Sequence, residues 1–81
     1  MKARVYVSLK ETVLDPQGKT ICQALQGMGY PEVQDVRQGK YFEIAIRGET
    51  NRSKAQQRLE EVAREVLANP VIEEYRLEFI D

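Results

Sequence analysis

Between its first extended segment and its first amphipathic segment the chain reads Val13-Leu14-Asp15-Pro16-Gln17-Gly18-Lys19-Thr20. Pro16 fixes its own φ angle, lacks an N–H and biases Asp15 towards an extended conformation, so a strand must end here. The Asp15 carboxylate can accept from unpaired N–H groups of the next helical turn, and proline suits the first helical position. The stretch therefore predicts a strand-to-helix turn that is capped by Asp15.

The segments on either side of this turn have clear periodicities. Residues 3–10 alternate between apolar and polar side chains, which predicts a half-buried strand. Apolar residues recur at helical spacing over residues 16–28, which predicts an amphipathic helix. They are Ile21, Ala24, Leu25 and Met28. Gly27 and Gly29 are suited to end that helix.

Residues 33–47 read as two strands, 33–38 and 41–47, joined tightly around Gly39. A single long strand that bends at Gly39 is the alternative, because glycine inside a strand can mark a bend instead of a turn. We expect the hairpin, with Phe42, Ile44 and Ile46 on one side of its second strand.

The second half of the chain predicts a helix and a final strand. Thr50 or Asn51 is expected to cap the helix, which Asn69-Pro70 terminates. Its apolar stripe is expected to comprise Ala55, Leu59, Val62, Ala63, Val66 and Leu67. Residues 72–80 then alternate again, with Tyr75, Leu77 and Phe79 facing inward.

This order of elements, βαββαβ, predicts a single α+β domain over residues 1–81. Right-handed crossovers place the two helices on one face of an antiparallel sheet, as in the split βαβ or ferredoxin-like fold. The other face of the sheet is then bare. Five side chains are expected to meet on it: Arg4, Tyr6, Tyr41, Glu43 and Arg47.

Composition excludes several classes of function. The chain has 81 residues, a net charge of -1, one cysteine and no histidine, so neither an internal disulfide nor a zinc site is expected. Mixed charges without a basic excess weigh against nucleic-acid binding. Without a membrane-length apolar run or a signal peptide, we expect a soluble, cytoplasmic protein.

Four patterns with possible chemistry have simpler structural interpretations. Gly18-Lys19-Thr20 resembles the end of a phosphate-binding loop, but Val13 stands where that motif needs glycine. Cys22 has no histidine to activate it, so a buried structural thiol is expected.

The other two patterns are charged. Four carboxylates flank the turns around the first helix: Glu11, Asp15, Glu32 and Asp35. The sequence does not indicate that any two of them come together for acid–base catalysis. The basic and aromatic run Arg37–Phe42 favours packing within a sheet over base stacking.

Several short runs resemble PurS, the small subunit of phosphoribosylformylglycinamidine (FGAM) synthase. The resemblance spans essentially the whole chain. The matching runs are Val13–Gly18, Ala24-Leu25, Gly29-Tyr30, Val36-Arg37, Gly39–Glu43 and Ala68–Ile72.

The resemblance implies a non-catalytic subunit that joins an ATP-dependent amidoligase, PurL, to a glutaminase, PurQ, and supports the transfer of ammonia between them. The complex carries out the fourth step of de novo purine synthesis and uses ATP, Mg²⁺ and glutamine, none of which this chain is expected to bind. A homodimer or a dimer of dimers is implied. Neither a membrane nor a nucleic acid is an expected partner.

On the matched positions, the resemblance implies partner contact at Asp15, Pro16, Gly18 and Lys19. It implies assembly contact at Arg37, Gly39, Lys40 and Tyr41. Two other classes share the order of elements. One is an ACT-like regulatory module that binds an amino acid at a dimer interface. The other is an acylphosphatase-type enzyme. Such enzymes carry an arginine-bearing loop, and residues 13–19 of this chain do not match that loop.

Overall fold

The computed structural model describes residues 1–48 and 51–80 of the chain, and its α+β class confirms the prediction. In chain order the elements are β1 (Lys2–Leu9), α1 (Pro16–Gly27), β2 (Gly39–Ala45), α2 (Arg52–Val62), a π-helical turn η1 (Ala63–Leu67) and β3 (Glu73–Phe79). The predicted Asn51 cap is confirmed, because its side chain accepts from the N–H of Lys54 at 3.1 Å. Thr50, the other candidate cap, lies outside the described residues.

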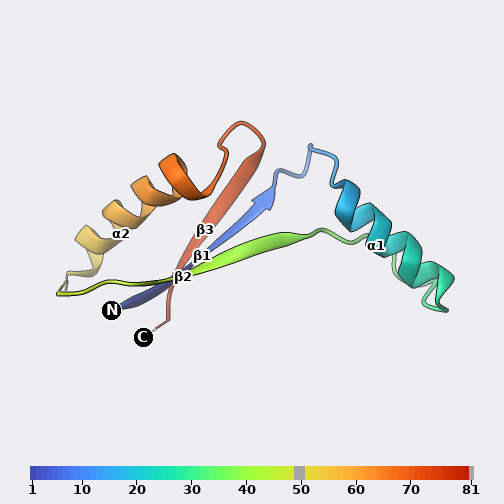
Figure 1. Cartoon of the computed structure of the whole chain (residues 1–81), viewed down its shortest axis with the longest axis horizontal. Coiled ribbons are helices and arrows are strands. Elements are labelled where there is room, and N and C mark those ends of the chain that lie inside the picture. Colours follow the sequence, from blue (N-terminus) through green and yellow to red (C-terminus); the bar gives the residue numbers. More distant parts are fainter. Residues whose placement is uncertain (49–50, 81) are drawn as a thin grey trace.

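The strands form one antiparallel sheet in the order β2-β1-β3. Alternate residues of the central strand, Ala3, Val5 and Val7, are buried on one face, as the alternation predicts. The helix α2 and the turn η1 lie against that face (Figure 1). The core contains Val5, Val7, Ala63 and Ala68, with half-buried side chains of β2 and β3 around them.

The end of the second helix departs from the predicted stripe. The N–H of Ala68 donates to the carbonyl of Ala63 at 2.8 Å, so the last turn is π-helical and holds one residue more than an α-turn. The wider turn rotates the following side chains, which buries Ala68 and leaves Val66 74% exposed. Val62 is exposed as well. The expectation that Val62 and Val66 belong to the buried stripe is therefore wrong.

The predicted strand over residues 33–38 is absent, and α1 does not lie on the sheet, so these two details of the ferredoxin-like prediction are wrong. Residues 33–38 are extended but pair with no strand of the described chain. Gly39 already pairs with Ser8 in the β1–β2 ladder, so the chain runs straight where a turn was expected. In Figure 1, α1 lies beyond the end of the sheet, opposite α2.

Candidate functional site

Asp15 caps α1 and also reaches the segment before β2. The residue is 5% exposed, and its carboxylate accepts from the N–H of Gly18 at 2.9 Å and from the N–H of Gln38 at 2.7 Å. The N–H groups of Gln38 and Gly18 hold the pKa of the Asp15 carboxyl below its ordinary value, against the opposing effect of burial. The carboxylate of Asp15, a residue predicted to contact a partner, therefore accepts hydrogen bonds from within its own chain.

Two further predicted contact residues hold the same junction together. Gly18 is buried, and a Cβ added there would meet the backbone carbonyl of Val36 well inside contact distance. Arg37 donates from Nη2 to the carbonyls of Lys10 and Val13 at 2.9 and 3.0 Å. We call these contacts of Asp15, Gly18 and Arg37 the brace, because they fix α1 to the segment that leads into β2.

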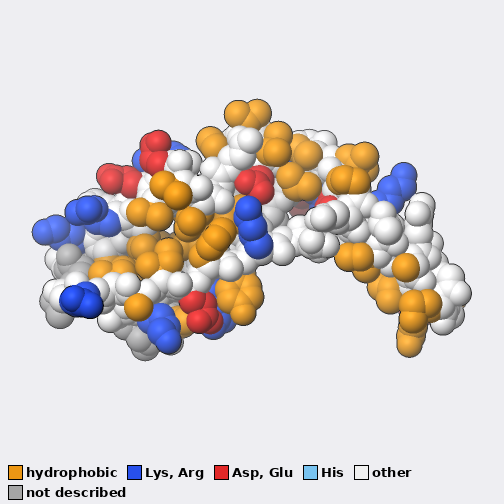
Figure 2. All heavy atoms as spheres, viewed as in Figure 1, with side chains coloured by type: hydrophobic (Ala, Val, Ile, Leu, Met, Phe, Trp, Pro, Cys, Tyr) orange, Lys and Arg blue, Asp and Glu red, His pale blue; other side chains and the backbone are white. Residues whose placement is uncertain are grey.

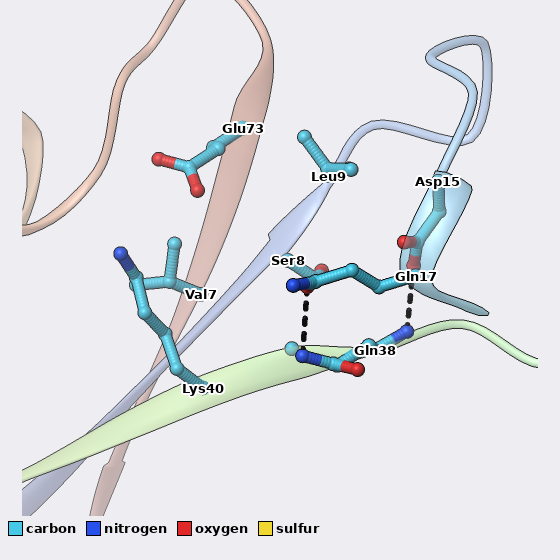
Figure 3. A pocket seen from close by; sticks show the side chains of 9 residues that line it. Val7, Ser8, Leu9, Asp15, Gln17, Gln38, Lys40 and Glu73 are labelled. Atoms are coloured by element: carbon cyan, nitrogen blue, oxygen red, sulfur yellow. Dashed lines mark hydrogen bonds between the residues drawn. The ribbon is translucent and has the colours of Figure 1, made fainter. Parts of the chain in front are cut away.

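Gln38, which is not among the predicted contact residues, is also part of this junction. Its side chain donates to Oε1 of Gln17 at 2.8 Å, while its backbone N–H meets Asp15 (Figure 3). A cavity of about 240 Å³ opens beside them, between β1, β2 and the start of β3. Lys40 and Glu73 line it from opposite sides of β1, as the close view shows.

The remaining predicted contact residues are spread over the surface. Pro16 and Lys19 are exposed on the first turns of α1. Gly39 and Lys40 begin β2, and Tyr41 points to the opposite face of the sheet from Lys40, because successive residues of a strand alternate. The structure therefore unites three of the eight candidates in the brace, and the other five form no single cluster.

The bare face of the sheet brings together four of the five residues expected there. Arg4 donates from Nη2 to Oε1 of Glu43 at 2.8 Å, and its guanidinium lies 5.1 Å from the centre of the Tyr41 ring. The rings of Tyr6 and Tyr41 are 5.9 Å apart. Arg47 is a correction: β2 ends at Ala45, and Arg47 instead lines a hollow beside α2.

A fifth residue of this face is Arg76 of β3. Its guanidinium lies 4.2 Å from the centre of the Tyr6 ring, and its Nη1 contacts Oε2 of Glu78 at 3.3 Å. Tyr6 of β1 pairs with Tyr41 of β2 on one side and with Arg76 of β3 on the other, so two tyrosine rings and one guanidinium lie in one row. Such a flat surface of tyrosine and arginine has the side chains that protein interfaces favour.

The two residue types considered for chemistry, the lone cysteine and possible metal ligands, can be placed over the described residues. Cys22 is buried, as predicted, and its Sγ lies 3.7 Å from the carbonyl oxygen of Val33. No three histidine, cysteine, aspartate or glutamate side chains gather where they could hold a metal ion in residues 1–48 and 51–80. Over the same ranges, neither helix has the length and apolarity needed to cross a membrane. The arrangement offers surfaces for protein contact.

Comparison with known families identifies this arrangement. The sequence model of the PurS family, described as phosphoribosylformylglycinamidine (FGAM) synthase, matches residues 2–81. The chain belongs to the PurS family.

Relatives agree with PurS membership along almost the whole chain. The phosphoribosylformylglycinamidine synthase subunit PurS of Bacillus subtilis is 52% identical over 77 residues, which cover 95% of this chain and 89% of that protein. A solved structure of B. subtilis PurS superposes with a TM-score of 0.85 at 50% identity, over 99% of this chain and 98% of the other.

A chain of the solved structure of PurLQS from Thermotoga maritima is similar as well. It has a TM-score of 0.87 at 32% identity, over 98% of this chain and 95% of that one. The two superpositions cover 98–99% of this chain, so they include the sheet as well as α1.

Proposed function

We propose that this chain is the non-catalytic PurS subunit of an FGAM synthase in purine biosynthesis. In this role it joins the ATP-dependent amidoligase PurL to the glutaminase PurQ and supports the passage of ammonia between them. The complex uses ATP, Mg²⁺ and glutamine, and this chain itself binds none of them. The whole chain acts as one domain, and the complex works in the cytoplasm.

The observation that carries the proposal is the similarity to a chain of the PurLQS structure over 98% of this sequence. The chemistry of the surface agrees with it. A coupling subunit needs contact surfaces and no nucleophile, and the bare face with its tyrosines and arginines is such a surface. Lys19, which is exposed at the start of α1, is a second contact candidate together with Pro16.

A homodimer, or a dimer of such dimers, is the form that we propose for the free protein. Support comes from its open shape: the radius of gyration is 16.2 Å, whereas a compact chain of this length has about 12 Å. Small domains that bury little of their own surface gain stability by association. Within the larger complex, the dimer offers two equivalent bare faces for the enzyme subunits.

The experiment is a reconstituted synthase assay with the PurL and PurQ subunits of the same organism, with and without this chain. Two nitrogen sources are compared, glutamine and free ammonium. Addition of this chain should restore the glutamine-dependent reaction and leave the ammonium-dependent reaction largely unchanged. If it changes neither reaction, the coupling role is wrong, and an amino-acid screen for thermal stabilisation then tests the ACT-like alternative.

A further inference from the structure

The inner face of the sheet, against which α2 and η1 lie, carries two opposite charges at one end. Directly paired residues of neighbouring strands lie on the same face. Lys40 pairs with the buried Val7, and Glu73 pairs with Leu9, so both charges belong to the inner face. The other paired residues of this face are apolar or aromatic: Ala3, Val5, Phe42, Ile44, Tyr75, Leu77 and Phe79. A cation and an anion on such a face require an explanation.

These two charges do not neutralise each other. In the part of the chain that the structure describes, neither Lys40 nor Glu73 forms an ion pair. They belong to the strands on either side of β1, so their backbones lie about 10 Å apart across the sheet. Figure 3 shows the two side chains approaching the space beside Val7 from opposite sides of β1. Figure 2 shows side chains of both charges near the centre of this view, with apolar side chains to either side.

Each of the two charged groups is positioned by a neighbour. Oε1 of Glu73 accepts from the N–H of Asn69 at 2.7 Å, and its Oε2 accepts no hydrogen bond within the described chain. The Lys40 ammonium lies 5.8 Å from the centre of the Phe42 ring, whose face attracts a cation. Groups that are positioned before a ligand arrives cost less entropy when it binds. The carboxylate and the ammonium are therefore prepared for an external partner.

The cavity between the two charges has a volume of about 240 Å³. Val7 and Leu9 contribute apolar side chains to its lining, while the amide groups of Gln17 and Gln38, bonded to each other at 2.8 Å, line it next to α1. One water molecule takes about 30 Å³ in the liquid, so the cavity has room for roughly eight non-hydrogen atoms. An apolar lining with a few convergent polar groups is typical of a site for a small molecule.

We propose that this cavity binds a small zwitterion, an α-amino acid with a short apolar side chain such as valine. The ammonium group of the ligand donates to Glu73, its carboxylate accepts from Lys40, and its side chain contacts Val7 and Leu9. Because Lys40 and Glu73 approach each other across one strand, the two charges of the ligand must also be close together, as they are in an α-amino acid. A simple anion or cation leaves one of the two protein charges unpaired.

Occupation of the cavity links parts of the fold that the chain itself leaves apart. A ligand that pairs with both charges connects β2 to β3 across β1 and lies beside Gln17 of α1. The unfolded chain does not bring these groups together, so the ligand binds the folded chain and raises its thermal stability. All the lining residues belong to one chain, and the site therefore rests neither on the proposed homodimer nor on the coupling of two enzymes.

The decisive measurement is a titration of the full ¹⁵N-labelled chain with L-valine, followed by amide NMR and by thermal unfolding. The backbone signals of Gly39, Lys40 and Glu73 should shift and saturate in the millimolar range, and the unfolding midpoint should rise. Isobutylamine lacks the carboxylate of valine and isovalerate lacks its ammonium group, so each should bind at least tenfold more weakly. Shifts that stay linear up to the solubility limit of valine, or equal binding of the three compounds, overturn the site. The synthase assay tests coupling separately.

Variants of the two charged residues give an independent test. Lys40→Met and Glu73→Gln remove one charge each with little change of shape, and each should raise the dissociation constant for valine at least tenfold. The controls Lys2→Met and Glu74→Gln make the same changes on the opposite face of the sheet and should leave the constant unchanged. Thermal unfolding without valine checks that the four variants fold. Unaltered binding after loss of either inner charge, or equal losses in the controls, contradicts the proposal; if a variant does not fold, the two single-charge compounds decide on the parent chain.

Discussion

The carboxylate of Asp15 accepts a hydrogen bond of 2.7 Å from the backbone N–H of Gln38, 23 residues further along the chain. The same side chain caps α1 through Gly18. One residue thus ends the strand-to-helix turn and fixes where the chain re-enters the sheet. This contact ties Gln38 to the start of α1, at the place where the expected hairpin would have turned.

Acid should weaken the fold through Asp15. Because the pKa of this carboxyl is lowered in the folded chain, its contribution to stability is complete above its ordinary value of 3.8. The contribution is lost as the pH falls from there through the lowered folded-state value. Denaturant unfolding between pH 2 and 7 should show that Asp15→Asn destabilises the protein near pH 7 and flattens its acid dependence. The control Asp35→Asn removes an exposed carboxylate from the segment before β2 and should keep the acid dependence of the parent chain.

Gly18→Ala should destabilise the protein by about 1–3 kcal/mol, since the added methyl group forces the helix away from the Val36 carbonyl. Gly27→Ala is the matched control in the same helix, because nothing lies within 4 Å of the position of its added Cβ. It should be neutral or stabilising by up to about 1 kcal/mol. Chemical unfolding of the two variants measures both changes. Equal destabilisation would show that helix packing at Gly18 is looser than described.

Leu59 and Val66 belong to the same apolar stripe in the sequence, but the π-helical turn predicts that their substitution has different effects on the free energy of unfolding. Leu59 is buried, so Leu59→Ala should cost about 2–5 kcal/mol of unfolding free energy. Val66 is mostly exposed, so Val66→Ser should change stability by about 0.5 kcal/mol or less. Thermal unfolding of each variant distinguishes the two burial patterns. A large loss at Val66 would mean that the last turn is α-helical or is covered by a partner.

Lys19→Glu should weaken binding to the proposed synthase subunits at least tenfold without changing the thermal stability of the free chain. Lys19 is exposed on α1 and its side chain is not part of the brace, so reversal of its charge acts on a partner surface and not on the fold. Lys54→Glu makes the same change on α2 and serves as the control. Biosensor measurements on assembled complexes provide the comparison. Identical affinities for the two variants would remove Lys19 from the contact surface.

Local features were predictable because they depend on neighbours in sequence. Asp15 before Pro16 specified the cap of α1, and the alternation of residues 3–10 specified β1 and its buried face. The alternation of residues 3–10 and 41–47 placed Arg4, Tyr6, Tyr41 and Glu43 on the bare face. The family could be identified from short runs along the chain, which the match over residues 2–81 confirms.

The untested contact residues illustrate the limit of such inference. Asp15, Gly18 and Arg37 matched the family at positions expected to touch a partner, yet their atoms hold the chain's own brace. Whether any of the eight candidate residues, these three included, touches another subunit stays a prediction. A motif shows which residues are present, but the same residues can be required for a contact within the chain or for a contact with a partner.

Two features depended on contacts between distant parts of the chain. The extended path of residues 33–38 is set by Gln38 and Arg37 reaching back to the first turn. The rotation that exposes Val66 is set by the burial of Ala63 and Ala68 against the sheet. Periodicity shows which residues of a segment share an apolar side, but it does not show which other part of the fold packs against that side. The path of residues 33–38 is therefore a property of long-range hydrogen bonds and packing.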